Sequence, residues 1–145
     1  MQWLLDTCVV SELTRKLPDE RVLRWLAENA GVAMLSTVSL GKIQYGIERL
    51  AAGRSRNTLQ LWFDGLCVQY APRLLPADEP VWRAYGRLKA SLEAIGRPQE
   101  DLDLLIAATA TVHRLTLVTR NTRHFEDSGV KTLNPWMDSS QSVEK

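Results

Sequence analysis

Short apolar runs alternate with longer amphipathic stretches along the 145 residues of this chain. The runs at residues 2–5, 32–35 and 115–118 have the length of buried strands, and residues 73–75 and 130–133 are also extended in pattern. Strands that helices separate must pair in parallel through crossovers rather than as hairpins. The alternation therefore predicts an α/β fold with a central parallel sheet and helices on both faces.

Helical periodicity fills the intervals between these runs. Ser36 or Thr37 can cap a helix that Gly53 ends, and its apolar stripe is formed by Leu40, Ile43, Ile47 and Leu50. The other predicted helices cover residues 9–15, 20–29, 57–70, 79–95 and 101–113. We predict one domain over residues 1–136, followed by a polar tail at residues 137–145.

Charge and composition exclude several classes of protein. The net charge of +1 gives no global basic field, so nucleic acid would be bound only through a local patch. No apolar run is long enough to span a bilayer, and Asp6 interrupts the first one, so neither a membrane protein nor a signal peptide is expected. Two cysteines do not make a disulfide framework, and a reduced cytoplasmic location is expected.

Two aspartates are the first candidates for a functional site. Asp6 ends the first predicted strand, where ligands bind in parallel α/β sheets, and Asp103 opens an alanine-rich helix much later in the chain. Brought together, the two carboxylates would form a site for a hard divalent cation. Helix capping is an equally good interpretation of each, because a helix N-terminus stabilises a carboxylate by roughly 0.3–1 kcal/mol.

Other chemistries find less support. His113 and His124 lack the spacing of a zinc site, and no P-loop or serine-hydrolase elbow occurs. A phosphatase of the haloacid type would need an aspartate two residues after Asp6, where this chain has Cys8. A basic cluster around Gly53 is either a solvated helix end or a phosphate-contacting rim formed by Arg49, Arg54 and Arg56.

Five ordered segments carry a resemblance to a known family. They are Leu-Leu-Asp-Thr at residues 4–7, Ser-Thr-Val-Ser-Leu-Gly-Lys-Ile at 36–43, Asp-Leu-Leu-Ile-Ala-Ala-Thr-Ala at 103–110, Leu-Val-Thr-Arg-Asn at 117–121 and Leu-Asn-Pro-Trp at 133–136. In this order and at these intervals they resemble the PIN-domain toxins of VapBC toxin–antitoxin modules, in particular the plasmid-stability and FitB-like subgroup.

The resemblance implies an α/β/α sandwich and a Mg²⁺- or Mn²⁺-dependent endoribonuclease. It implies a VapB-type antitoxin as partner, an RNA substrate, operator DNA bound only through the antitoxin, and a homodimer or a toxin–antitoxin hetero-oligomer. By position, Asp6 and Asp103 match metal-binding acids, and Thr7 and Thr119 match hydroxyls near the site. Arg49 is an additional candidate for substrate contact.

The chain departs from the family pattern at several site positions. Lys42 stands where the family has a glutamate, Asn121 occupies the fourth acidic position, and Cys8 replaces an asparagine. The subgroup often carries an acid slightly after that fourth position, where this chain has His124. Asp6 and Asp103 remain as the clear metal carboxylates, with Asp101 as an alternative donor.

Lys42 is the departure with the largest chemical consequence. Glutamate to lysine changes the local charge by two units, and an ammonium about 4 Å from a carboxylate gains roughly 4 kcal/mol at an effective dielectric near 20. We therefore predict that Lys42 pairs with Asp6 or Asp103 and weakens the nuclease. An engineered inactivation and a natural degenerate copy would each explain such a residue.

Two functions from different classes follow. In the first, the chain is an endoribonuclease toxin that Lys42 impairs. In the second, it is catalytically inactive and acts by binding antitoxin and aiding autoregulation of a promoter. For antitoxin binding we expect an apolar groove for an amphipathic helix, with Trp25, Trp62 and Phe63 as the excess apolar surface.

Overall fold

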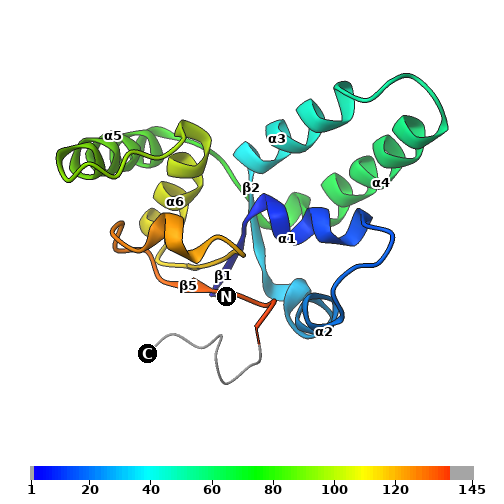
Figure 1. Cartoon of the computed structure of the whole chain (residues 1–145), viewed down its shortest axis with the longest axis horizontal. Coiled ribbons are helices and arrows are strands. Elements are labelled where there is room, and N and C mark those ends of the chain that lie inside the picture. Colours follow the sequence, from blue (N-terminus) through cyan, green and yellow to red (C-terminus); the bar gives the residue numbers. More distant parts are fainter. Residues whose placement is uncertain (1, 138–145) are drawn as a thin grey trace.

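The computed structural model describes residues 2–137, and at its centre lies a five-stranded sheet (Figure 1). All neighbouring strands are parallel, and the order across the sheet is β3-β2-β1-β4-β5. The strands are β1 (Trp3–Leu5), β2 (Met34–Ser36), β3 (Leu74–Leu75), β4 (Thr116–Val118) and β5 (Thr132–Leu133). The predicted α/β fold with a central parallel sheet is confirmed.

Helices flank the sheet on both sides (Figure 1). They are α1 (Thr7–Ser11), α2 (Glu20–Asn29), α3 (Thr37–Glu48), α4 (Arg54–Tyr70), α5 (Glu79–Ala94) and α6 (Asp101–His113). Short 3₁₀ helices are η1 (Glu12–Thr14), η2 (Ala30–Val32), η3 (Ala71–Arg73) and η4 (Thr122–Phe125). Several α-helices begin at a side-chain cap, as Ser36 does by accepting from the backbone N–H of Val38.

Side-chain alternation divides the core into two main layers. Leu5 and Val118 pack on the same side of the sheet as α1, α2, α3 and α4. Their neighbours Leu4 and Leu117 face the other way and pack against Ile106 and adjacent residues of α6. Because consecutive residues of a strand point to opposite faces, even three-residue strands contribute buried side chains to both layers.

The order of the strands indicates the position of a candidate site, the crevice at the carboxyl end of β1. From β1 the chain builds β2 and β3 on one side, and it returns through α5 and α6 to add β4 and β5 on the other. The direction of winding therefore reverses at the β1–β4 pair. Ligands of open α/β sheets bind beyond the carboxyl ends of strands at such a point, and the residue that follows β1 is Asp6.

Local boundaries differ from the sequence predictions in a few places. Leu50 lies beyond the end of α3 and is exposed rather than on its buried stripe, and Val32 belongs to exposed η2 rather than to β2. The polar turn predicted at residues 119–122 runs into the 3₁₀ helix η4. Of the predicted tail, residues 138–145 lie outside the described residues. No helix within residues 2–137 is long and apolar enough to cross a membrane.

Candidate functional site

Asp6 is the buried polar residue around which the crevice is built. The residue is only 4% exposed, although it lies at the end of a strand. One carboxylate oxygen, Oδ1, accepts a 2.8 Å hydrogen bond from the backbone N–H of Thr7 and caps α1. The other, Oδ2, accepts a 2.8 Å hydrogen bond from the hydroxyl of Thr119. Asp6 is thus both a helix cap and a fixed carboxylate in the crevice.

Thr119 meets Asp6 because of the register between β1 and β4. Leu5 pairs with Val118, so the next residue of each strand emerges beside the other, and the N–H of Asp6 donates to the Val118 carbonyl at 2.9 Å. Thr119 is fully buried, and its hydroxyl also accepts from the N–H of Asn121 at 3.0 Å. One threonine therefore connects the carboxylate to the start of the η4 loop.

Cys8 and Thr7 complete the surroundings of Asp6. The Cys8 sulfur lies 3.8 Å from Oδ2 of Asp6 and 3.8 Å from the hydroxyl oxygen of Thr119. Burial, together with the charge of Asp6, raises the pKa of the Cys8 thiol to about 11, so it stays protonated and unreactive at neutral pH. The Thr7 hydroxyl donates to the Ser39 hydroxyl at 3.0 Å and joins α1 to α3.

Asp103 enters the crevice from the first turn of α6 and forms an ion pair with Lys42. The Nζ atom of Lys42, which lies on α3, is 3.1 Å from Oδ1 of Asp103. Both side chains are largely shielded, with exposed fractions of 27% for Lys42 and 18% for Asp103. The ion pair predicted for Lys42 is therefore present, and the partner that it contacts is Asp103.

The charges of these residues act on one another. Burial raises the pKa of Asp6, and the negative charge of Asp103 raises it further. The hydrogen bonds from Thr119 and Thr7 and the ammonium of Lys42 oppose this rise. The ammonium of Lys42 thus lowers the pKa of Asp6, and the carboxylate of Asp103 raises it.

A divalent cation does not fit this set of donors as it stands. Both oxygens of Asp6 already accept hydrogen bonds, and Oδ1 of Asp103 faces the Lys42 ammonium. Within residues 2–137 no three His, Cys, Asp or Glu side chains come together as a metal-binding group. Mg²⁺ needs negatively charged oxygen ligands in octahedral arrangement, and the ammonium cancels half of the available charge.

Other predicted site residues lie at the margin of the crevice or away from it. Asn121 is exposed, and its N–H, rather than its side chain, makes the contact with Thr119. Arg49 follows the end of α3, where its guanidinium lies 5.5 Å from the centre of the exposed Tyr45 ring. Arg56, from the same basic cluster, pairs with Glu48. The roles proposed for Asn121 and Arg49 stay predictions.

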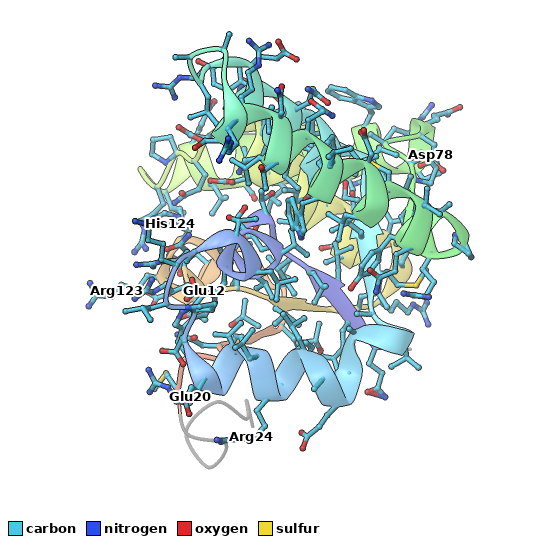
Figure 2. All side chains as sticks on the ribbon, turned by 90° about the vertical axis from the view of Figure 1, so that its right-hand side faces the viewer. Glu12, Glu20, Arg24, Asp78, Arg123 and His124 are labelled. Atoms are coloured by element: carbon cyan, nitrogen blue, oxygen red, sulfur yellow. The ribbon has the colours of Figure 1, made fainter. Side chains whose placement is uncertain are left out.

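Neither of the two alternative positions considered for a further acid, residues 101 and 124, supplies a carboxylate to the crevice. Asp101 accepts from Lys89 at 2.8 Å and from the Tyr85 hydroxyl at 2.7 Å, both on α5. His124 is exposed in η4, and Figure 2 shows it at the periphery together with Arg123. Glu12 is buried, but its carboxylate accepts from the backbone N–H of Asp19 and closes the loop before α2.

The three aromatic residues predicted to supply excess apolar surface contribute mainly to the core. Phe63 is buried, and Trp25 and Trp62 are partly buried against the same core cluster, so these three residues are largely used by the fold itself. Sequence periodicity does not separate a core tryptophan from a surface one. A groove of about 180 Å³ nevertheless lies beside the crevice, between α1, α3 and α4, and its lining includes Lys42, Thr7, Ile43, Leu59 and Trp62.

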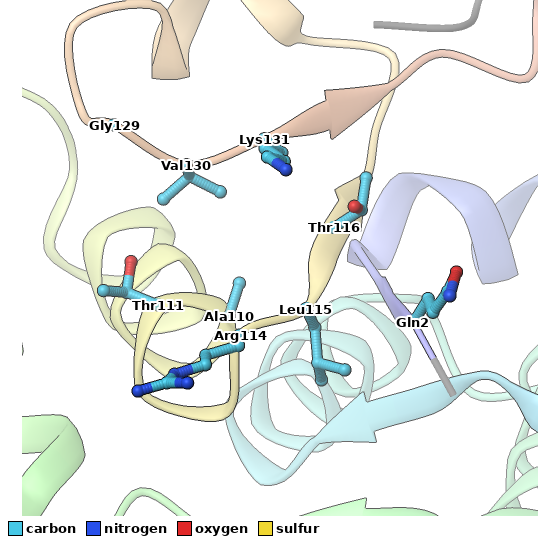
Figure 3. A pocket seen from close by; sticks show the side chains of 9 residues that line it. All are labelled: Gln2, Ala110, Thr111, Arg114, Leu115, Thr116, Gly129, Val130 and Lys131. Carbon is cyan, nitrogen blue, oxygen red and sulfur yellow. The ribbon is translucent and has the colours of Figure 1, made fainter. Parts of the chain in front are cut away.

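A larger hollow lies at the opposite end of the sheet. It has a volume of about 450 Å³ and opens beside the amino ends of β4 and β1, where Gln2, Arg114 and Thr116 line it (Figure 3). None of its lining residues is among the buried polar residues of the structure. The buried carboxylate lies at the carboxyl end of the sheet, and we place the candidate site there.

Comparison with known proteins identifies the family. Residues 3–130 match the PIN domain. The chain belongs to the PIN-domain family. Among curated PIN-domain relatives, Toxin FitB of Neisseria gonorrhoeae is 36% identical over 137 residues, covering 93% of this chain and 99% of that protein. VapC ribonuclease Y4jK of Sinorhizobium fredii is 35% identical over 135 residues, covering 92% and 96%.

Solved structures show the same PIN-domain architecture. The structure of FitAB bound to the IR36 DNA fragment superimposes with a TM-score of 0.89 at 34% identity, covering 94% of this chain and 97% of that chain. The crystal structure of FitAcB from Neisseria gonorrhoeae gives a TM-score of 0.88 at 35% identity, covering 94% and 99%. The resemblance recognised from the five sequence segments is confirmed.

Proposed function

We propose that this PIN domain is the toxin of a type II toxin–antitoxin module and that it cleaves RNA phosphodiesters in the crevice of Asp6 and Asp103. The observation that carries the proposal is a buried carboxylate at the winding reversal of the sheet, fixed by Thr7 and Thr119, with a second carboxylate entering from α6. Relatives that cover nearly the whole chain are named as toxins and ribonucleases, which supports this function.

The residues of the crevice have separable tasks in this proposal. Thr119 and the N–H of Thr7 hold the Asp6 carboxylate in one orientation, while α6 presents Asp103. Mg²⁺ or Mn²⁺ is the proposed cofactor; Asp6 and Asp103 would hold it, and it would supply an activated water for hydrolysis of a phosphodiester. Because the donors present do not fit the ion while Lys42 pairs with Asp103, we expect this chain to be a slow nuclease.

We propose an antitoxin as the protein partner and the cytoplasm, where RNA is available, as the place of action. The groove between α1, α3 and α4 is where an amphipathic segment would dock, next to the crevice that it would cover. Structures with similar folds include FitAB bound to DNA and a VapBC2 complex bound to a promoter fragment. Contact with operator DNA through the antitoxin, in a homodimer or hetero-oligomer, is part of this proposal.

The Lys42–Asp103 ion pair favours a second candidate function. If the ion pair abolishes catalysis altogether, the chain acts by binding antitoxin and aiding autoregulation of the promoter. Co-expression with an antitoxin should then give a stable complex, although the free chain cleaves no RNA. Absence of antitoxin binding in titration calorimetry would contradict both candidate functions.

Cleavage of a transfer-RNA pool in Mn²⁺ tests the nuclease proposal. We compare the chain as it stands, Lys42→Glu, and Lys42→Glu combined with Asp6→Asn, each with and without EDTA. Lys42→Glu is expected to cleave fastest, because position 42 then adds an acid beside Asp6 and Asp103. Adding Asp6→Asn, which keeps the shape of the side chain, should abolish cleavage. Folded variants that all leave RNA intact would overturn the proposal.

A further inference from the structure

The crevice already contains a cation that belongs to the chain. The Nζ atom of Lys42 lies 3.1 Å from Oδ1 of Asp103, and its charge acts on the buried carboxylate of Asp6 as well. We infer that Lys42 takes the place of the divalent cation and leaves the folded crevice too little negative charge to bind the metal tightly. This inference rests on the proposed function in treating the crevice as the site for the cofactor.

Charge is the first step of the argument. Asp6 and Asp103 carry two negative charges, and the Lys42 ammonium leaves about one net negative charge in the crevice. Glutamate at position 42 would leave about three. The attraction of a divalent ion for the crevice scales with this charge, since Coulomb energy is proportional to the product of the charges. Position 42 therefore controls whether the ion is bound.

Occupancy of the donor atoms is the second step. A divalent ion bound by both acids would meet the ammonium at Oδ1 of Asp103 and share Oδ2 of Asp6 with the Thr119 hydroxyl. The ion would leave the Lys42 ammonium, on a side chain that is 27% exposed, without its carboxylate partner and next to a second cation. Charged groups that are shielded from water are costly to leave unpaired, so the lysine resists displacement.

A second ion pair on the same helix supplies the matched control. Lys89 of α5 lies 2.8 Å from Asp101, two residues before Asp103, but both of these side chains are more exposed than those of the Lys42–Asp103 pair. The change Lys89→Glu alters the charge of the protein by as much as Lys42→Glu does, and it does so outside the crevice. It separates a local effect of position 42 from a general effect of net charge.

Titration calorimetry with Mn²⁺ on the full chain tests the inference directly. We expect no saturable binding by the chain as it stands or by Lys89→Glu within the range of the titration. Lys42→Glu should show one saturable site, with a dissociation constant roughly 100-fold or more below the limit set by the parent. Mn²⁺ should raise the melting temperature of Lys42→Glu but not that of the parent or of Lys89→Glu, since a ligand that binds the folded state stabilises it. Asp6→Asn added to Lys42→Glu should weaken the binding.

Lys42→Met keeps the test decisive if three clustered acids prevent folding of Lys42→Glu. This variant removes the ammonium without adding an acid, and its Mn²⁺ affinity should lie between those of the parent and Lys42→Glu. Mn²⁺ binding by the parent as tight as by its position-42 variants would overturn the inference, and so would failure of both variants to gain binding. If Lys42→Glu binds Mn²⁺ yet cleaves no RNA, the inference holds and the nuclease proposal fails.

Discussion

Two lysine–aspartate ion pairs involve the first turn of α6. Their N–O distances alone would suggest that the outer pair contributes more to stability than the inner one. The outer pair, Lys89–Asp101, is the shorter at 2.8 Å, but its side chains are 39% and 58% exposed. The inner pair, Lys42–Asp103, measures 3.1 Å with exposed fractions of 27% and 18%. Exposed pairs contribute little to stability because water and salt screen them.

The neighbours of each pair explain the difference. Asp101 also accepts from the Tyr85 hydroxyl at the surface, where water can replace any lost hydrogen bond. Asp103 faces a crevice whose other carboxylate, on Asp6, is 4% exposed and depends on the hydroxyl of Thr119. The same chemical pair is thus a surface contact in one place and a shielded contact within the candidate site in the other.

The largest difference in stability should come from removing the hydroxyl that donates to each acid, Thr119 beside Asp6 and Tyr85 beside Asp101. Thr119→Val removes the donor to Oδ2 of Asp6 while keeping the shape of the side chain. We expect it to lower the free energy of unfolding by about 2 kcal/mol, because a buried carboxylate loses its partner. Tyr85→Phe should leave the urea midpoint unchanged. Equal losses in the two variants would remove the distinction between the inner and outer sites.

The lysines should show a smaller difference in the same direction. Lys42→Met leaves Asp103 unpaired beside Asp6, and we expect a loss of roughly 1 kcal/mol in the free energy of unfolding. Lys89→Met should produce no measurable change. Thermal melting in EDTA measures both, and repeating it in Mn²⁺ should recover part of the loss in Lys42→Met. A larger loss of stability for Lys89→Met would show that the N–O distance of an ion pair matters more here than its burial.

The smallest effects are opposite displacements of two carboxyl titrations. Burial raises the pKa of Asp6 above its usual 3.8, whereas the hydrogen bonds from Lys89 and Tyr85 lower the pKa of Asp101. Asp6 therefore favours folding below pH 3.8, an effect lost as pH rises through its folded pKa. Asp101 favours folding above pH 3.8, an effect lost as pH falls through its lowered pKa.

Carbon-13 NMR of the side-chain carboxyls follows both titrations in the folded protein. The midpoint of Asp6 should lie above 3.8 and that of Asp101 below it. Asp6→Asn and Asp101→Asn assign the signals. If the two midpoints appeared in the reverse order, the assignment of a buried inner acid and a solvated outer one would be wrong.

Much of the fold could be predicted from the sequence because its signals are local. Apolar runs such as residues 115–118, the cap at Ser36 and the stop after residue 95 each follow from nearby chemistry. Boundaries failed where tertiary packing decides, as at Leu50, whose helical spacing continues after α3 has ended. The 3₁₀ helix η4 has no periodicity that would have predicted it.

The site could be predicted only in outline. Placement at a strand end and a helix start indicated Asp6 and Asp103, and the family pattern indicated Lys42. The packing of α3, α5 and α6 decides that Lys42 pairs with Asp103 and that Asp101 pairs with Lys89 of α5. The sequence does not predict this packing. The Thr7–Ser39 contact depends on the packing of α1 against α3, and no spacing in the sequence predicts it.

The central claim is that the Lys42 ammonium is the cation of this crevice. Anomalous diffraction at the manganese edge, from crystals of the chain and of Lys42→Glu grown in Mn²⁺, tests it most directly. We predict a peak between Asp6 and Asp103 in Lys42→Glu, and in the parent no peak and Nζ within hydrogen-bonding distance of Asp103. A manganese peak at the same position in the parent, with Lys42 turned away, would contradict the account.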